Sequence, residues 1–285
     1  MIRYRRCDEV TEHQIYEAFN RGFSDYIIKL QIPKELFLKR FFGMEMNRRE
    51  LSYLALDYEK PVGIILGGIN EFDGLNTMRC GTFAVDPVYR GKGISRKLFN
   101  YHKSEARKHN CKQLMLEVID YNNRAINFYK KMGYEKVYDI SYFTLKDFSK
   151  IKNSLKNHIK VDEIKIDQLR WIRNRIKDVH INWQNSIDYI ELTEGQLNFG
   201  AYVSGSLIGA LSISSNGKIS FIWVDYSFRS SGIGTYLLFH TIEKLELKKA
   251  TISFTNNAIL DRFIRGLGFV RDSISQYEMY NYDKL

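Results

Sequence analysis

The feature that most constrains the fold of this chain is an internal repeat. Val85–Ser95 and Val224–Gly234 share, without a gap, a Val-Asp pair, an Arg four positions after the Asp, and a Gly-Ile pair. Farther along, 122–134 aligns with 257–269 through an Asn, a Phe, a Gly and a final aromatic residue. Two blocks that recur in the same order indicate a duplicated domain.

The repeat divides the chain into two predicted copies, 1–145 and 159–285. Between them, 146–158 is polar and rich in Lys and Asn, which is typical of a linker. We therefore expect two domains of similar fold joined by a short connection.

Both copies show the same order of predicted strands and helices. In the first copy we expect strands at 51–57, 62–69, 78–85 and 114–118, with helices after Gly93 and at 123–132. In the second we expect strands at 199–203, 208–213, 219–224 and 250–254, with helices after Gly232 and up to about Gly266. The pattern predicts an α/β class of fold in each copy.

Composition indicates a folded globular protein. Apolar residues make up 44% of the 285 residues, charged residues 27%, and only three residues are Pro. No apolar stretch resembling a signal peptide follows Met1, and the longest apolar run, Val62–Ile69, is too short to cross a bilayer. Cys7, Cys80 and Cys111 are scattered without metal-ligand spacing. We expect a cytoplasmic protein with no metal and no membrane contact.

The net charge of +10 has two interpretations. A basic surface can bind nucleic acid, or it can attract a polyanionic small molecule to its pocket. No nucleic-acid-binding module accompanies the charge. We therefore expect no nucleic-acid partner.

A glycine-containing loop follows the predicted strand that ends at Val85 and precedes a predicted helix. The N–H groups of a first helical turn have no partner within the helix, so a pyrophosphate can bind there. Gly91 and Gly93 let the backbone approach an anion closely, because they carry no Cβ. The pattern predicts a phosphate-binding loop, and Gly232 and Gly234 predict a second one.

The order strand, Arg-x-x-Gly-x-Gly/Ala, helix resembles the signature of the GNAT acetyltransferase superfamily, and the chain contains it twice. The matching residues are Arg90, Gly93 and Ser95 in the first copy, with Ser in place of the final Gly or Ala, and Arg229, Gly232 and Gly234 in the second. The first copy also has the Val-Asp-Pro that precedes the Arg and the family's later positions, which are Asn122, Ala125, Tyr129, Gly133 and Tyr134.

The resemblance implies a fold and a cosubstrate. The fold is α/β (α+β): a mixed sheet splayed at its centre and flanked by helices, in two tandem copies. The cosubstrate is acetyl-CoA, with the pantetheine arm paired to the strand ending at Val85 like an added strand. The residues expected to bind it are Val85, Arg90, Gly91, Lys92, Gly93, Ile94, Ser95 and Asn122, and in the second copy Arg229, Gly232 and Gly234.

The implied activity is direct transfer of an acetyl group from acetyl-CoA to a primary amine. A Tyr on the helix after the fifth strand protonates the CoA thiolate in this family, and Tyr129 stands at that position. A core position is the alternative for Tyr129, because either it or the adjoining Phe128 must face inward. The second copy has Ile264 there, which cannot donate a proton. We expect the first copy to be catalytic and the second to be degenerate.

The general base and the acceptor are left open by the sequence. The strand 78–85 has no carboxylate, although many family members carry a Glu there. Glu117, Glu71 and Asp25 are the candidate bases, and a water chain is a further possibility. Helices at 11–23 and 34–46 and a hairpin around 138–142 are expected to select a small-molecule or peptide amine.

Two further questions stay open. A non-catalytic acyl-CoA sensor or scaffold is the alternative function, because Ser95 departs from the signature and the strand before the loop has no carboxylate. The chain is expected to be either a monomer with two pseudo-dimeric halves or a homodimer.

Overall fold

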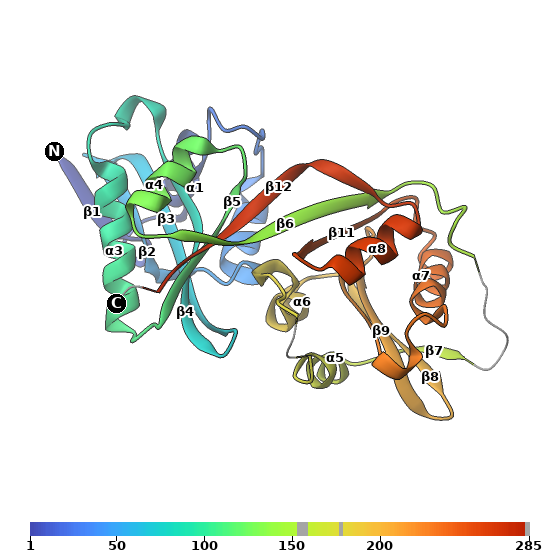
Figure 1. Ribbon diagram of the computed structural model, residues 1–285. Coiled ribbons are helices and arrows are strands. Elements are labelled where there is room, and N and C mark those ends of the chain that lie inside the picture. Colours follow the sequence, from blue (N-terminus) through green and yellow to red (C-terminus); the bar gives the residue numbers. More distant parts are fainter. Residues whose placement is uncertain (153–158, 177–178, 283–285) are drawn as a thin grey trace. The chain divides into compact units, whose positions relative to one another are not determined.

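A computed structural model describes residues 1–152, 159–176 and 179–282. These residues form two compact units (Figure 1). Unit 1 comprises 1–138 and the chain from Gln276 onward, and unit 2 comprises 139–275. Each unit contains a mixed sheet with helices on both faces, so the predicted fold class and its two copies are confirmed. The predicted linker, 146–158, lies partly outside the described residues.

Unit 1 contains the strand order β1-β2-β3-β4-β5-β12, in which only β4 and β5 are parallel neighbours. Its elements are β1 (Ile2–Arg6), α1 (Glu12–Gly22), α2 (Lys34–Lys39), η2 (Arg40–Met44), β2 (Arg48–Asp57), β3 (Lys60–Phe72), β4 (Leu75–Val85), η3 (Pro87–Tyr89), α3 (Ile94–Lys108), β5 (Gln113–Ile119), α4 (Asn123–Lys131), the first part of β6 (Glu135–Leu145) and the last part of β12 (Val270–Asn281).

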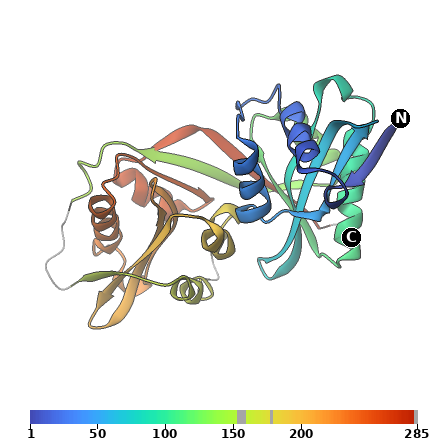
Figure 2. The ribbon, with the colours of Figure 1, turned by 180° about the vertical axis from the view of Figure 1, so that it is seen from behind.

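The sheet of unit 1 is buried on both faces. Ile64 and Leu66 of β3 pack with α1 and α2, whereas Val62 and Ile65 pack with α3 and α4. Figure 2 shows α1 and α2 over the face of this sheet that is turned away in Figure 1. A strand covered on both faces needs apolar residues at consecutive positions, which explains the apolar run at 62–69.

Unit 2 repeats this plan with the strand order β6-β11-β10-β9-β8-β7. Its elements are β7 (Lys160–Glu163), α5 (Ile166–Arg173), η4 (Trp183–Asn185), α6 (Ile187–Leu192), β8 (Gln196–Val203), β9 (Ser206–Ser214), β10 (Lys218–Val224), η5 (Tyr226–Phe228), α7 (Ile233–Lys244), β11 (Ala250–Thr255) and α8 (Ala258–Gly266). Helices α7 and α8 cover one face of the sheet, and α5 and α6 cover the other.

Each sheet is completed by a strand from the other half of the sequence. Residues 276–281 of β12 pair antiparallel with β5 in unit 1, and residues 140–145 of β6 pair antiparallel with β11 in unit 2. The hairpin expected around 138–142 is therefore wrong. That stretch lies inside one continuous strand, because β6 extends far enough to complete the sheet of unit 2.

Candidate active site

The predicted phosphate loop begins where β4 ends. Asp86 fixes its first turn: the backbone N–H of Asp86 donates to the carbonyl of Val62 at 2.9 Å, and its carboxylate accepts from the N–H of Val88 at 3.0 Å. Gly91 and Gly93 then adopt φ values of 77° and 80°. This left-handed conformation suits glycine, and it turns the chain directly into α3.

The loop and the start of α3 form an open anion cradle. Gly91, Lys92 and Gly93 are exposed, and a Cβ built on either glycine would meet nothing within 4 Å. Helix α3 is 15 residues long and begins at Ile94, so the N–H groups of its first turn point toward the loop without partners inside the helix. These amides and the helix dipole fit a pyrophosphate group.

Arg90 does not extend into this cradle. Its Nε donates to the carbonyl of Val85 at 2.9 Å, and its guanidinium donates to both carboxylate oxygens of Asp25 and to the carbonyl of Gly22. The backbone N–H of Arg90 donates to Pro87 at 3.3 Å. The side chain of Arg90 therefore ties the end of β4 to the chain that follows α1.

The sheet of unit 1 splits next to the loop. Strands β4 and β5 pair from Thr77 with Gln113 to Cys80 with Leu116, and in the described part of unit 1 the pairing goes no farther. Beyond that point β5 continues beside β12, while β4 continues to Val85 with only β3 as its neighbour. The stretch 81–85 therefore has one backbone edge without a strand partner, which an extended amide chain could fill.

Tyr129 lies beside this split. It projects from α4 into the core on the side of α3, is 7% exposed, and packs against Phe83, which belongs to the unpaired stretch of β4, with ring centroids 6.2 Å apart. Burial, followed by the nearby Cys80 and Tyr26, raises the pKa of Tyr129 well above its ordinary value. The phenol therefore keeps its proton at neutral pH, as a general acid must.

Asn122 begins the helix that carries Tyr129. Its side chain accepts the backbone N–H of Ala125 at 3.3 Å, which caps α4. The side chain of Asn122 also hydrogen-bonds to Tyr26, from the chain after α1. In this structure Asn122 thus orients α4, and its predicted contact with CoA stays a prediction.

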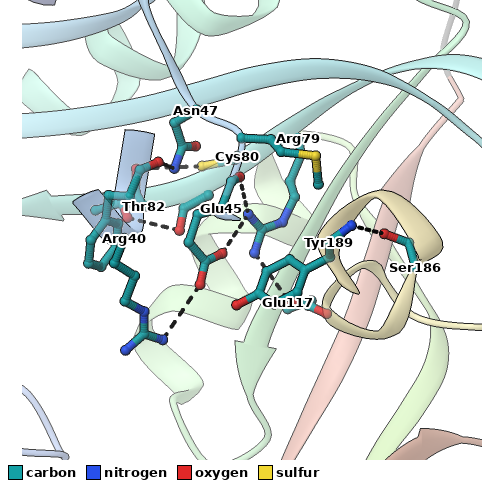
Figure 3. A network of polar contacts seen from close by, with 12 residues as sticks. Arg40, Glu45, Asn47, Arg79, Cys80, Thr82, Glu117, Ser186 and Tyr189 are labelled. Atoms are coloured by element: carbon teal, nitrogen blue, oxygen red, sulfur yellow. Dashed lines mark hydrogen bonds and ion pairs between the residues drawn. The ribbon is translucent and has the colours of Figure 1, made fainter. Parts of the chain in front are cut away.

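Glu117 lies on β5 just past the last residue that pairs with β4. Its Oε2 is 3.2 Å from Nη2 of Arg79, and Nη1 of Arg79 is 3.1 Å from Oε2 of Glu45 (Figure 3). All three side chains are at most 5% exposed. Since Leu116 and Val118 face α3 and α4, Glu117 faces the opposite side of the sheet. Glu117 and Tyr129 thus border the split from opposite faces.

The structure does not bring Glu71 to the split. Glu71 is exposed near the tip of the β3–β4 hairpin and pairs with Asn76, whereas Val85 lies at the other end of β4. At about 3.3 Å per residue, these two ends of β4 are roughly 30 Å apart.

Unit 2 contains a second loop of the same form. Asp225 accepts the N–H of Ser227 at 3.0 Å, Nε of Arg229 donates to the carbonyl of Val224 at 3.2 Å, and Gly232 adopts a φ of 87° before α7. Gly234, in the first turn of α7, would place a Cβ 3.0 Å from the ring of Phe263. The predicted residues of the second loop therefore repeat the backbone arrangement of the first.

The split in unit 2 is filled by its own chain. Strands β10 and β11 pair only at Lys218 with Thr251 and Ile219 with Ile252. Because the N–H of Thr251 donates toward β10, Ser253 directs its carbonyl the same way. That carbonyl accepts from Nδ2 of Asn185 at 2.7 Å.

Other residues near Asn185 are also buried or hydrogen-bonded. Trp183, in the same short helix, is 1% exposed, and the hydroxyl of Thr255 donates to the carbonyl of His180 at 2.9 Å. Ile264, which stands where unit 1 has Tyr129, is buried in the core with α7. Unit 2 thus has the loop without a phenol, and a side-chain amide bonded to the edge of β11 that faces its split.

The sequence led us to expect no metal site and no membrane contact. Within the described residues, no cluster of three or more His, Cys, Asp or Glu side chains is placed to bind a metal ion. No helix in that part of the chain is long and apolar enough to cross a membrane.

Two family models match the chain, one in each half. The Acetyltransferase (GNAT) family matches residues 13–134, and the Acetyltransferase (GNAT) domain matches residues 171–280. The chain belongs to the GNAT family of acetyltransferases and contains two GNAT domains in tandem. The family suggested by the loop motifs is thereby confirmed.

Curated relatives match parts of the chain. The N-alpha-acetyltransferase 30 of Saccharomyces cerevisiae is 30% identical over 114 residues, which are 37% of this chain and 62% of that protein. An uncharacterised N-acetyltransferase of Methanocaldococcus jannaschii is 29% identical over 127 residues, 43% of this chain and 54% of that protein. Thialysine N-epsilon-acetyltransferase of Bos taurus is 43% identical over 49 residues, 17% of this chain and 29% of that protein. The chain therefore spans less than two thirds of the length of these relatives.

Solved structures with the same fold match nearly the whole chain. A tandem GNAT protein from the clavulanic acid biosynthesis pathway superimposes with a TM-score of 0.71 at 15% identity, covering 98% of both chains. A GCN5-related N-acetyltransferase from Sphaerobacter thermophilus gives a TM-score of 0.70 at 12% identity, covering 98% of this chain and 95% of that one. At these identities the similarity concerns the fold alone.

Sequence reasoning missed the residues that surround Glu117. Arg79 and Glu45 were not among the candidates, although Arg79 forms a direct ion pair with Glu117 and Glu45 pairs with the same guanidinium group. One signal was present: Arg79 is a charged residue between Met78 and Cys80 in a strand that had to be buried. A buried charge needs a partner of opposite sign, so Arg79 in this strand indicates a buried carboxylate nearby.

Proposed function

We propose that unit 1 is an acetyl-CoA-dependent N-acetyltransferase that transfers the acetyl group directly to a primary amine. One observation carries this proposal: the open cradle at Gly91–Ser95 follows directly after the unpaired stretch 81–85, and Tyr129 packs against Phe83 within that stretch. An anion site and a free strand edge thus lie on one segment, with a proton donor from α4 packed beside it.

The cradle is proposed to bind the pyrophosphate through backbone N–H groups from Gly91 to Ser95, with Lys92 beside it and the buried Ile94 anchoring the helix start. The free edge of β4 up to Val85 would bind the pantetheine amides. Arg90 and Asn122 shape this site through their own hydrogen bonds. Bound acetyl-CoA supplies the thioester carbonyl that the amine attacks.

Tyr129 and Glu117 are proposed to act from the two sides of the split. The amine nitrogen forms the new bond to the carbonyl carbon, and the bond from that carbon to sulfur breaks. Tyr129 gives its proton to the sulfur, and the amine loses its proton to a base. Glu117 is the first candidate for this base because it borders the split. Glu71 ranks second because it lies on the β3–β4 hairpin, far from the split.

The chemistry is assigned to unit 1 for two reasons. Ile264 has no proton to give, and the amide of Asn185 already bonds to the carbonyl of Ser253 in the split of unit 2. Arg229, Gly232 and Gly234 retain the form of the second loop.

The acceptor is proposed to be a primary amine of a small molecule or a peptide. The relatives are named for acetylation at N-alpha of one kind of acceptor and N-epsilon of another, and both are amino groups.

Release of free thiol from acetyl-CoA tests this function. The purified protein should release CoA thiol in the presence of at least one amine from a panel of amino acids, polyamines and short peptides. Tyr129→Phe should lower the rate by about 10²-fold or more while the dissociation constant for CoA changes less than about threefold. Binding of CoA without thiol release from any amine would favour the non-catalytic sensor, and absence of CoA binding would refute both functions.

A further inference from the structure

Tyr134 carries a buried hydroxyl group that has no hydrogen-bond partner among the described residues. The residue follows Gly133, just after α4, and is 1% exposed. Its ring lies 6.1 Å from that of Tyr129 and 5.6 Å from that of Phe99, centroid to centroid. A buried tyrosine hydroxyl nearly always finds a partner, so this one requires an explanation.

The duplicated domain shows that packing alone does not need this hydroxyl. Phe269 stands at the equivalent position in unit 2 and is 3% exposed. The backbone is the same in both units: the N–H of Tyr134 donates to the carbonyl of Tyr129 at 3.0 Å, and the N–H of Phe269 donates to that of Ile264 at 3.1 Å. The same turn is therefore built with a phenyl ring.

The two hydroxyls are also lost together. Unit 1 has Tyr129 and Tyr134, whereas unit 2 has Ile264 and Phe269 at the matching places. A hydroxyl that served the fold would be needed in both units. One that served the proton donor would be needed only where the donor is present, and this is the observed distribution.

We propose that Tyr134 is a positioning residue whose hydroxyl donates a hydrogen bond to the phenolic oxygen of Tyr129 while Tyr129 gives up its proton. The inference rests on the proposed function of unit 1. In this step the proton of Tyr129 moves to the sulfur of CoA as the bond from carbon to sulfur breaks. Tyr134 keeps its own proton and only shares it with the oxygen of Tyr129.

The environment of Tyr129 explains why such a donor is useful. Burial disfavours a charged phenolate, and the pKa of Tyr129 is raised accordingly. Burial, Cys80 and Tyr129 also raise the pKa of Tyr134, so its hydroxyl remains a donor. A hydrogen-bond donor that reaches developing negative charge stabilises it strongly in a site that excludes water. The hydroxyl of Tyr134, which has no partner among the described residues in this structure, turns toward the oxygen of Tyr129 as that charge develops.

Tyr134→Phe tests the inference because it copies unit 2 and changes no carbon atom of the ring. We expect kcat to fall about tenfold or more with the KM for acetyl-CoA changed less than about twofold, and the melting temperature to stay equal or rise, since an unsatisfied buried group is removed. Tyr101→Phe is the matched control, because this ring stacks on Tyr53 in the same core, away from the split, and its activity should not change. Unchanged kcat in Tyr134→Phe would overturn the inference.

A double-mutant cycle separates this inference from the proposed function. In a Tyr129→Phe background, Tyr134→Phe should have no further effect on kcat, because the oxygen that it serves is absent. An equal loss in both backgrounds would overturn the inference and leave the proposed acid role of Tyr129 intact. Full activity of Tyr129→Phe alone would instead refute that acid role, and the inference with it.

Discussion

The guanidinium group of Arg90 forms a two-point ion pair with the carboxylate of Asp25, in which Nη2 lies 2.7 Å from Oδ1. The same arginine donates through Nε to the carbonyl of Val85. The arginine of the loop motif thus joins the end of β4 to the chain after α1. The side chain of Arg90 thus fixes the loop at the end of β4, and the backbone N–H groups from Gly91 onward are available to bind an anion.

Asp25→Asn is expected to weaken cofactor binding rather than chemistry. Losing the ion pair frees Arg90 and loosens the loop, so the KM for acetyl-CoA should rise about two- to fivefold, in the range of a partly exposed charged contact, with kcat nearly constant. Steady-state kinetics measures both. Asp261→Asn, which breaks the exposed pair with Arg265 in unit 2, is the control and should change neither constant.

The ion pair also predicts how cofactor binding responds to pH. The hydrogen bond from Arg90 lowers the pKa of Asp25 below its ordinary value. A carboxyl group with a lowered pKa makes its full contribution to cofactor binding at pH values above its ordinary pKa. It loses that contribution as the pH falls through the lowered pKa. The contribution of Asp25 should therefore be constant from pH 8 to about pH 5. A ratio of Asp25→Asn to wild-type KM that changes within this range would contradict the assignment.

One acetyl-CoA is expected to bind per chain. Gly93→Glu places a side chain and a negative charge at a φ of 80° in the open cradle, so CoA affinity should fall by about 10²-fold or more. Gly232→Glu makes the same change at a φ of 87° in unit 2 and should leave affinity and activity unchanged, because Asn185 fills that split. Isothermal titration gives the stoichiometry, and two sites in the wild-type chain would contradict a filled unit 2.

The sequence was sufficient to predict the loops, because their signals are local. A strand, an Arg, small residues and a helix occupy a short stretch, and the repeat supplies the same stretch twice. Tyr129 could be placed for the same reason, since Asn122 and Gly133 bracket its helix. Gly93 and Gly232 both adopt the left-handed conformation that such a loop requires.

The exchange of strands and the partners of Glu117 could not be predicted. Pairing of 276–281 with β5 joins residues far apart in the sequence, and nothing in β12 itself selects β5 over another strand edge. Arg79 contacts Glu45 and Glu117 only because the end of η2, β4 and β5 pack together in the fold. The spacing of these three residues in the sequence does not indicate that their side chains contact one another in the fold.

His102 is expected to make stability sensitive to mild acid. The residue is fully buried in α3, neither ring nitrogen has a partner among the described residues, and burial lowers its pKa to about 3 although Glu105 opposes the shift. The unfolded chain binds this proton near pH 6.5 and the folded chain does not. The free energy of unfolding should therefore decline as pH falls from about 6.5 toward 3, by up to about 1.4 kcal/mol per pH unit.

Chemical denaturation between pH 7 and pH 5 measures this slope. His102→Gln should flatten it, whatever its effect on stability at pH 7, because Gln binds no proton in this range. His109→Gln, at the exposed end of α3, should retain the wild-type slope. The pKa of His240 in unit 2 is also lowered by burial, so a residual slope in His102→Gln is expected, whereas an undiminished one would exclude His102 as its main source.

Glu117 and Glu71 are distinguished by a pair of isosteric variants. Glu117→Gln should lower kcat/KM for the amine by about 10²-fold, within the range of general base catalysis, while Glu71→Gln, at the exposed hairpin, should leave it unchanged. Since the substitution removes a buried counter-charge of Arg79, Glu117→Gln should also cost stability. Arg79→Met should also destabilise unit 1, by about 3–5 kcal/mol, and displace Glu117. Wild-type kcat/KM in folded Glu117→Gln would show that the proton leaves the amine by another route, with the Glu45–Arg79–Glu117 cluster serving the fold alone.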